Sequence, residues 1–78
     1  MNSLLLVEDD ERISQPLVRM LQAEGFTVRH VDHGEAALAA VGGEEPDLVL
    51  LDLSLPDIDG LDVCRRIRAI YPRLPIVM

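Results

Sequence analysis

Carboxylates follow two apolar runs of this chain, and their positions suit the binding of a metal ion. Glu8 and Asp9 come directly after the run Ser3–Val7, and Asp52 ends the run Leu48–Leu51. Apolar runs without polar alternation are typical of strands that are covered on both faces of a parallel sheet. Open α/β sheets bind ligands at the carboxyl ends of their strands. We therefore expect Glu8, Asp9 and Asp52 to converge on one small cleft.

Three carboxylates in one cleft repel one another, and each raises the pKa of the others unless a cation neutralises them. Mg²⁺ fits such a site, because it binds one or two carboxylates, keeps several waters and completes its coordination with phosphate oxygens. The two acidic segments, taken separately, each have a simpler explanation. Residues 8–11 could be an acidic first helical turn favoured by the helix dipole, and Asp52 could be a cap or turn residue. The combination favours the metal site.

The chain alternates predicted strands and helices with short connections. We expect strands at residues 3–7, 26–31, 48–51 and 76–78, and helices at about 10–24, 34–41 and 60–71. This β-α-β-α-β-α-β order predicts an α/β fold with a doubly wound parallel sheet and right-handed crossovers. Continuous apolar strands indicate helices on both faces of that sheet.

Several local features define the predicted helices. Asp10 is a plausible N-cap of the first helix, and Pro16 should kink or loosen it. The segment 42–46 reads as a turn that follows the second helix. In the third helix one face is expected to hold Leu61, Cys64, Ile67 and Tyr71, whereas Arg65, Arg66 and Arg68 point mostly outward. Pro56 and Gly60 predict a loop at 53–59, in which Asp57 is assigned no catalytic role.

Composition narrows the class of protein. Seventy-eight residues allow one small domain, and a net charge of -7 argues against direct binding of nucleic acid by this chain. Cys64 is the only cysteine, so no intrachain disulfide can form, and a reducing compartment such as the cytoplasm is expected. No signal peptide or membrane-spanning segment is predicted. His30 and His33 lack the spacing of a zinc site.

The chain resembles the receiver domain of two-component response regulators. The resemblance rests on residues 7–10, on the apolar strand that ends in Asp52, and on Pro56 followed by Asp59 and Gly60. It spans the whole chain and implies a flavodoxin-like sheet of strand order 2-1-3-4-5. Residues 61–68 look most like the subgroup whose second domain is a winged-helix DNA-binding unit, which implies a transcriptional output.

The resemblance also implies roles for individual residues. Asp52 would be the phosphoryl acceptor, and a sensor histidine kinase would be the donor. Asp9 and Asp52 would ligate Mg²⁺ directly, and Glu8 would act mostly through a bound water. The residue two positions beyond the acceptor, Ser54, would offer its backbone carbonyl to the metal. The protein would thus be a signalling domain and not an enzyme in the ordinary sense.

The chain departs from the full receiver pattern in its distal half. A complete receiver carries Thr or Ser at the end of its fourth strand and Lys at the end of its fifth, whereas this chain has no lysine and only Thr27. We therefore expect residues 1–78 to form a partial receiver that ends inside the fourth strand. The open edge at residues 76–78, or the sheet face beside it, would then be available for pairing with a second copy.

Two other functions compete with the receiver hypothesis. A Mg²⁺-dependent phosphohydrolase with an aspartyl nucleophile would resemble the haloacid dehalogenases, which place a second Asp two residues after the first. Ser54 occupies that position here, which disfavours this alternative. The other alternative is an acidic interaction module without catalysis, in which the carboxylates are surface groups. Titration with magnesium distinguishes the interaction module from the receiver.

Overall fold

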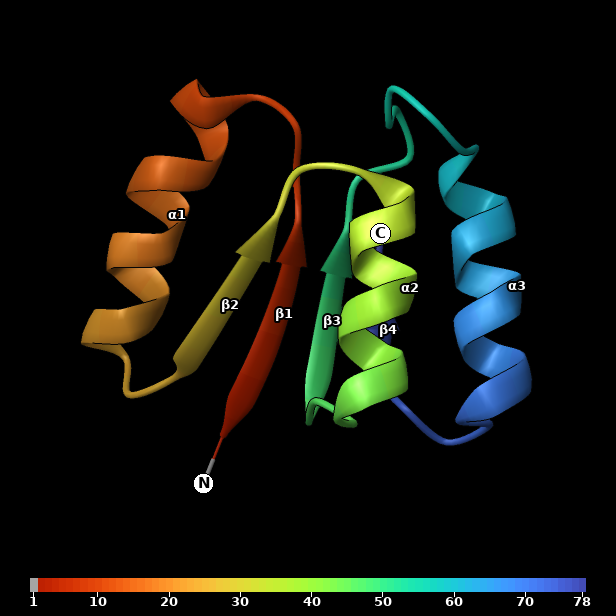
Figure 1. Cartoon of the computed structure of the whole chain (residues 1–78). Helices are drawn as coiled ribbons and strands as arrows, with labels where there is room; N and C mark the ends of the chain where they lie inside the picture. The colour runs from red at the N-terminus through yellow and green to blue at the C-terminus, as the bar shows by residue number, and fades with distance from the viewer. Residues whose placement is uncertain (1) are drawn as a thin grey trace.

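A parallel four-stranded sheet carries three helices in the computed structural model, which describes residues 2–78 (Figure 1). The elements alternate along the chain as the sequence predicts. They are β1 (Ser3–Val7), α1 (Glu11–Ala23), β2 (Thr27–Val31), α2 (Gly34–Gly43), β3 (Leu48–Leu51), α3 (Gly60–Ile70) and β4 (Ile76–Val77). The expected α/β class with a parallel sheet is confirmed.

The strand order is β2-β1-β3-β4, and every adjacent pair is parallel. The register places Val7 beside Val31 on one side and beside Leu51 on the other. All strands therefore end at the same edge of the sheet. The connections that leave β1 and β3 emerge side by side there, which is the neighbour relation that the predicted site requires.

Helices α2 and α3 cover one face of the sheet, and this face holds the main core. Alternate residues of β1 and β3 point into it, because side chains alternate across a strand. The core joins Leu5, Val7, Val49 and Leu51 to Ala37, Ala40, Val41, Val63, Ile67 and Leu74. Helix α1 packs chiefly against β2. The face beside α1 is less complete, and Leu48 and Leu50 are only half-buried on it.

Two expectations about the helices need correction. Helix α2 continues to Gly43 instead of ending at residue 41, and the Glu44 N–H closes it by donating to the Ala40 carbonyl at 3.2 Å. In α3 the core face holds Val63 and Ile67, whereas Leu61 is 44% exposed. Leu61 precedes Val63 by two residues, about 200° around a helix, so the two side chains face opposite ways.

Asp10 caps α1 as predicted, and its side chain accepts a hydrogen bond from the Arg12 N–H. The kink or loosening at Pro16 stays a prediction, and α1 runs as one element from Glu11 to Ala23 with Pro16 inside it. Cys64 is a free, half-buried thiol packed against the core. These features leave the carboxyl edge of the sheet as the place where polar groups gather.

Candidate functional site at the carboxyl edge of the sheet

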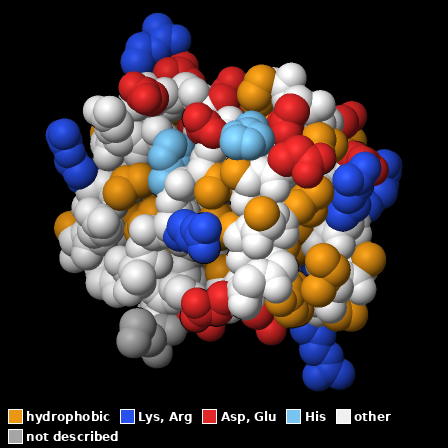
Figure 2. Space-filling view, viewed as in Figure 1, with side chains coloured by type: hydrophobic (Ala, Val, Ile, Leu, Met, Phe, Trp, Pro, Cys, Tyr) orange, Lys and Arg blue, Asp and Glu red, His pale blue; other side chains and the backbone are white. Residues whose placement is uncertain are grey.

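Glu8, Asp9 and Asp52 meet at the carboxyl ends of β1 and β3. One carboxylate oxygen from each residue lies within 4.8 Å of the other two. Backbone pairing brings them together, because the Asp52 N–H donates to the Val7 carbonyl at 3.0 Å. Acidic side chains are prominent along this edge of the molecular surface, at the top of Figure 2. The predicted convergence of the three residues is therefore present.

The electrostatics of this cluster favour a cation. Partial burial raises the pKa of Glu8 above its usual 4.5, and the neighbouring Asp52 and Asp9 raise it further. The Asp10 N–H opposes this shift by donating to Glu8 Oε2 at 3.2 Å. A raised carboxyl pKa means that the folded chain destabilises the ionised form of that carboxyl group. Three oxygen donors with this mutual repulsion match the chemistry of a hard divalent ion.

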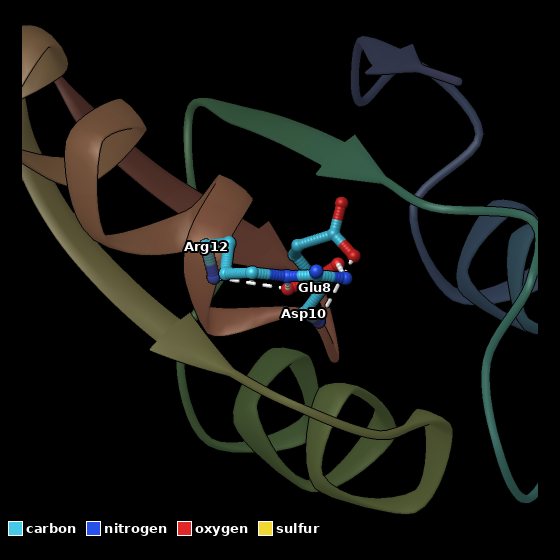
Figure 3. A network of polar contacts seen from close by, with 3 residues as sticks. All are labelled: Glu8, Asp10 and Arg12. Atoms are coloured by element: carbon cyan, nitrogen blue, oxygen red, sulfur yellow. Dashed lines mark hydrogen bonds and ion pairs between the residues drawn. The ribbon is translucent and has the colours of Figure 1, made fainter.

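The connection between β1 and α1 is held by contacts between near neighbours (Figure 3). Asp10 accepts from the Arg12 N–H at 2.9 Å and forms an ion pair with the Arg12 guanidinium at 2.9 Å. Arg12 lowers the pKa of Asp10, mainly through the hydrogen bond between their side chains. Two longer contacts come from β2. The Glu8 N–H donates to the Val31 carbonyl at 3.1 Å, and His30 Nε2 donates to the Glu8 carbonyl at 2.8 Å. These bonds orient the peptide that joins Glu8 to Asp9.

The loop between β3 and α3, residues 53–59, is held differently. We call it the β3–α3 loop. The Ser54 N–H donates to Asp52 Oδ1 at 3.2 Å, so the start of the loop is linked to the third carboxylate of the cluster. At its base the Gly60 N–H donates to the Leu53 carbonyl at 3.2 Å. Ser54 itself is exposed beside the cluster.

Sequence reasoning missed Asp57. Its carboxylate accepts from the N–H groups of Gly34 and Glu35, at 2.7 and 2.9 Å, and so caps α2 from a distant part of the chain. A signal was available, because His33 stands at the N-cap of α2 and has no side-chain capping bond. Ser, Thr, Asp or Asn is the usual choice at that position. His33 instead pairs with Asp32 at 2.7 Å.

No other metal site competes with this cluster in the described part of the chain. Among residues 2–78, Glu8, Asp9 and Asp52 are the only group of three His, Cys, Asp or Glu side chains close enough to share an ion. Neither His30 nor His33 belongs to that group. None of the helices described over the same residues has the length and hydropathy needed to span a membrane.

Comparison with known proteins covers nearly the whole chain. The family model of the response regulator receiver domain matches residues 4–78. The transcriptional regulatory protein CreB of Escherichia coli (strain K12) is 43% identical over 72 residues, which are 92% of this chain and 31% of CreB. The sensory transduction protein RegX3 of Mycobacterium tuberculosis is 45% identical over 78 residues, which are 100% of this chain and 34% of RegX3.

A solved structure shows the same architecture. The response regulator TrrA of Thermotoga maritima, crystallised in complex with Mg²⁺–BeF, superposes with a TM-score of 0.92 at 36% identity. The match covers 97% of this chain and 66% of TrrA. The chain spans about a third of the length of the curated relatives it matches.

Proposed function

Because this chain belongs to the response regulator receiver domain family, we propose that Asp52 is its phosphoryl acceptor. The donor would be a phosphohistidine of a sensor histidine kinase. An Asp52 oxygen attacks the phosphorus, the phosphorus–nitrogen bond breaks, and the imidazole leaves with the bonding electron pair. The observation that supports this proposal is the cluster of Glu8, Asp9 and Asp52, whose carboxylate oxygens lie within 4.8 Å of one another and could hold a cation beside the acceptor.

We propose that the cluster holds Mg²⁺. Asp9 and Asp52 would be direct ligands, Glu8 would act mostly through water, and Ser54 would supply its backbone carbonyl. The ion would neutralise the charge that develops on the transferred group, which is the main requirement of phosphoryl transfer. The fit is supported by the oxygen donor set and by the raised pKa of Glu8, whose ionised form an adjacent cation stabilises.

We expect phosphorylation of this chain to be slow. Residues 1–78 contain no lysine, so within them no lysine side chain can assist the metal in neutralising the phosphoryl charge. Loss of one preorganised electrostatic partner typically lowers a rate by about 10²–10³-fold. The acidic cluster would still direct phosphorylation to Asp52.

Acetyl phosphate and MgCl₂ test the acceptor directly. We expect the intact mass to rise by one phosphoryl group, and the modification to disappear in Asp52→Asn. Asp47→Asn is the matched control, because Asp47 lies at the opposite end of β3, where it accepts from the Ser3 N–H at 2.7 Å. Labelling that persists in Asp52→Asn would refute the assignment. Hydrolysis of a phosphate ester with turnover would favour the phosphohydrolase instead.

We propose a cytoplasmic, transcriptional setting for the whole protein. One curated relative, CreB, is named as a transcriptional regulatory protein, and this chain matches about a third of its length. DNA binding would reside outside these 78 residues, since their net charge of -7 opposes contact with phosphate backbones. A reporter gene driven by the cognate promoter, with Asp52→Asn in the complete regulator, would test the output.

We further propose that two copies of this chain can pair through the β4 edge or the adjoining sheet face. β4 has β3 as its partner on one side, and Val77 and Met78 are 54% and 59% exposed beside the other side. An open apolar strand edge is a template for another chain. Light scattering after size exclusion, over a dilution series, should show concentration-dependent association. A monomer at every concentration would refute pairing.

A further inference from the structure

The β3–α3 loop is tied at two places, and only one of them lies within the loop's own neighbourhood. The base is closed by the Gly60 N–H on the Leu53 carbonyl, at 3.2 Å. The tip is fastened by Asp57 to the first turn of α2, through bonds of 2.7 and 2.9 Å. Ser54 lies between these two ties and is exposed. The position of its backbone therefore depends on both.

The tip of the loop packs closely against the first residue of α2, Gly34. A Cβ on Gly34 would lie 3.2 Å from Asp57 Oδ1 and 3.1 Å from the Ile58 Cβ, so glycine is what allows the loop to approach this closely. The backbone N–H groups of Glu35 and Gly34 lower the pKa of Asp57 below its usual 3.8, because they stabilise the ionised carboxylate. His33 contributes no capping bond, so the distant carboxylate supplies what the N-cap residue does not.

We propose that Asp57 is a positioning residue for the phosphoryl-transfer site, acting by anchoring the β3–α3 loop to α2. The anchored loop presents the Ser54 carbonyl toward the cation site and holds the Ser54 N–H on Asp52. This inference rests on the proposed function of Asp52. It goes further by assigning Asp57 a role in metal affinity, although Asp57 lies outside the carboxylate cluster.

The expected effect on metal binding is moderate. Groups bonded directly to a metal ligand typically change affinity by 10–100-fold when they are removed. Asp57 acts through the loop backbone, so we expect Asp57→Ala to weaken Mg²⁺ binding by about threefold to tenfold. Asp57→Asn keeps the side-chain volume and one acceptor oxygen, so its Mg²⁺ affinity should lie between those of the wild type and Asp57→Ala.

A double variant separates loop positioning from simple helix capping. His33 has the extended backbone of an N-cap, with φ -153° and ψ 166°, so His33→Ser can cap α2 locally. In Asp57→Ala combined with His33→Ser, the capping of α2 returns but the loop stays unanchored. We expect the melting temperature to recover, while Mg²⁺ affinity, measured by titration with MgCl₂, stays reduced. His33→Ser alone should leave Mg²⁺ affinity unchanged.

Amide hydrogen exchange without metal provides an independent readout. Asp57→Ala should speed exchange at Gly34, Glu35 and Ser54, and the double variant should restore protection at Glu35 only. Recovery of both Ser54 protection and Mg²⁺ affinity in the double variant would reduce Asp57 to a helix cap and overturn the inference. Unchanged Ser54 exchange in Asp57→Ala would also overturn it. If the wild-type chain binds no Mg²⁺, the proposed function fails, and exchange at Ser54 still decides whether Asp57 anchors the loop.

Discussion

The two segments that carry the acidic cluster are held in place by different kinds of contact. In the β1–α1 connection, residues 8–10, the carboxylates bond to neighbours in sequence, since Glu8 accepts from the Asp10 N–H and Asp10 accepts from the Arg12 N–H, while the Glu8 backbone bonds to β2. The β3–α3 loop relies on partners far along the chain, because Asp57 bonds to Gly34 and Glu35. The carboxylates of Glu8 and Asp10 are therefore bonded locally, whereas the Asp57 carboxylate is bonded across the fold.

This difference predicts different responses to mutation. The cap at Asp10 can be lost without moving the rest of the site, because β1, which precedes it, still holds the backbone of Glu8 and Asp9. A long-range tie joins two elements, so its loss affects both. We therefore expect the larger effects in the β3–α3 loop and the smaller ones in the β1–α1 connection.

The largest effect is expected for Gly60→Ala at the base of the β3–α3 loop. The added Cβ would lie 2.6 Å from the Leu53 Cα and 2.7 Å from the Asp52 carbonyl oxygen, both of which are backbone atoms. The loop would have to open, at a cost of about 2–3 kcal/mol in the free energy of unfolding. Urea unfolding measures this cost.

Gly42→Ala is the matched control for that variant. Gly42 also lies in a helix, but a Cβ there has no atom within 4 Å. Alanine should be neutral or should stabilise the chain by about 0.5–1 kcal/mol. Equal losses in Gly60→Ala and Gly42→Ala would show that the close approach at Gly60 has no special importance.

Asp10→Ala tests the local side of the comparison. It removes the N-cap of α1 and the ion pair with Arg12, so the melting temperature should fall by roughly 5 °C. Because the folded pKa of Asp10 lies below 3.8, its contribution is present above pH 3.8 and is lost as pH falls through the folded value. Asp10→Asn, which keeps a capping oxygen, should lose less. A shift in Ser54 exchange would contradict the view that this cap acts locally.

Glu8→Gln should separate stability from metal binding. The folded pKa of Glu8 is raised above 4.5, so its contribution to stability is present below pH 4.5 and is lost as pH rises through the folded value. With chelator at pH 7, Glu8→Gln should therefore melt slightly above the wild type, and its Mg²⁺ affinity should be lower. Thermal melts at pH 4 and pH 7 check the sign, and a lower melting temperature at pH 7 would contradict the electrostatic strain described for Glu8.

The smallest effect is expected on the pKa of His33, which precedes the α2 residues that bond to Asp57. Its pKa is raised above 6.5 mainly by the hydrogen bond to Asp32, with lesser contributions from Asp57 and Glu35. Its stabilisation is thus present below pH 6.5 and lost as pH rises through the folded value. In an NMR titration Asp32→Asn should lower the pKa of His33 more than Asp57→Ala does. The reverse order would mean that the charge of Asp57 outweighs the local pair.

Local patterns predicted most of the fold and the identity of the clustered carboxylates. The apolar runs before Glu8 and Asp52 indicated buried parallel strands, and the common direction of those strands placed their carboxyl ends together. Errors arose where packing outweighed a local signal. Gly42 and Gly43 suggested a turn, yet α2 extends through both and Tyr71 donates to the Val41 carbonyl at 2.7 Å. Leu61 looked like a core residue, but the geometry of the packed helix chose Val63.

Sequence alone was enough to predict the alternation of elements, the cap at Asp10 and the residue types of the acidic cluster, because each follows from short-range periodicity or from contacts between near neighbours. The anchoring of the β3–α3 loop could not be predicted in this way, because it depends on the tertiary fold. Asp57 and Gly34 are separated by 23 residues, and no local pattern connects them. Their bond forms because the parallel sheet brings the start of α2 beside the loop that follows β3. There the backbone donors of α2 lack a cap of their own, and the Asp57 carboxylate satisfies them.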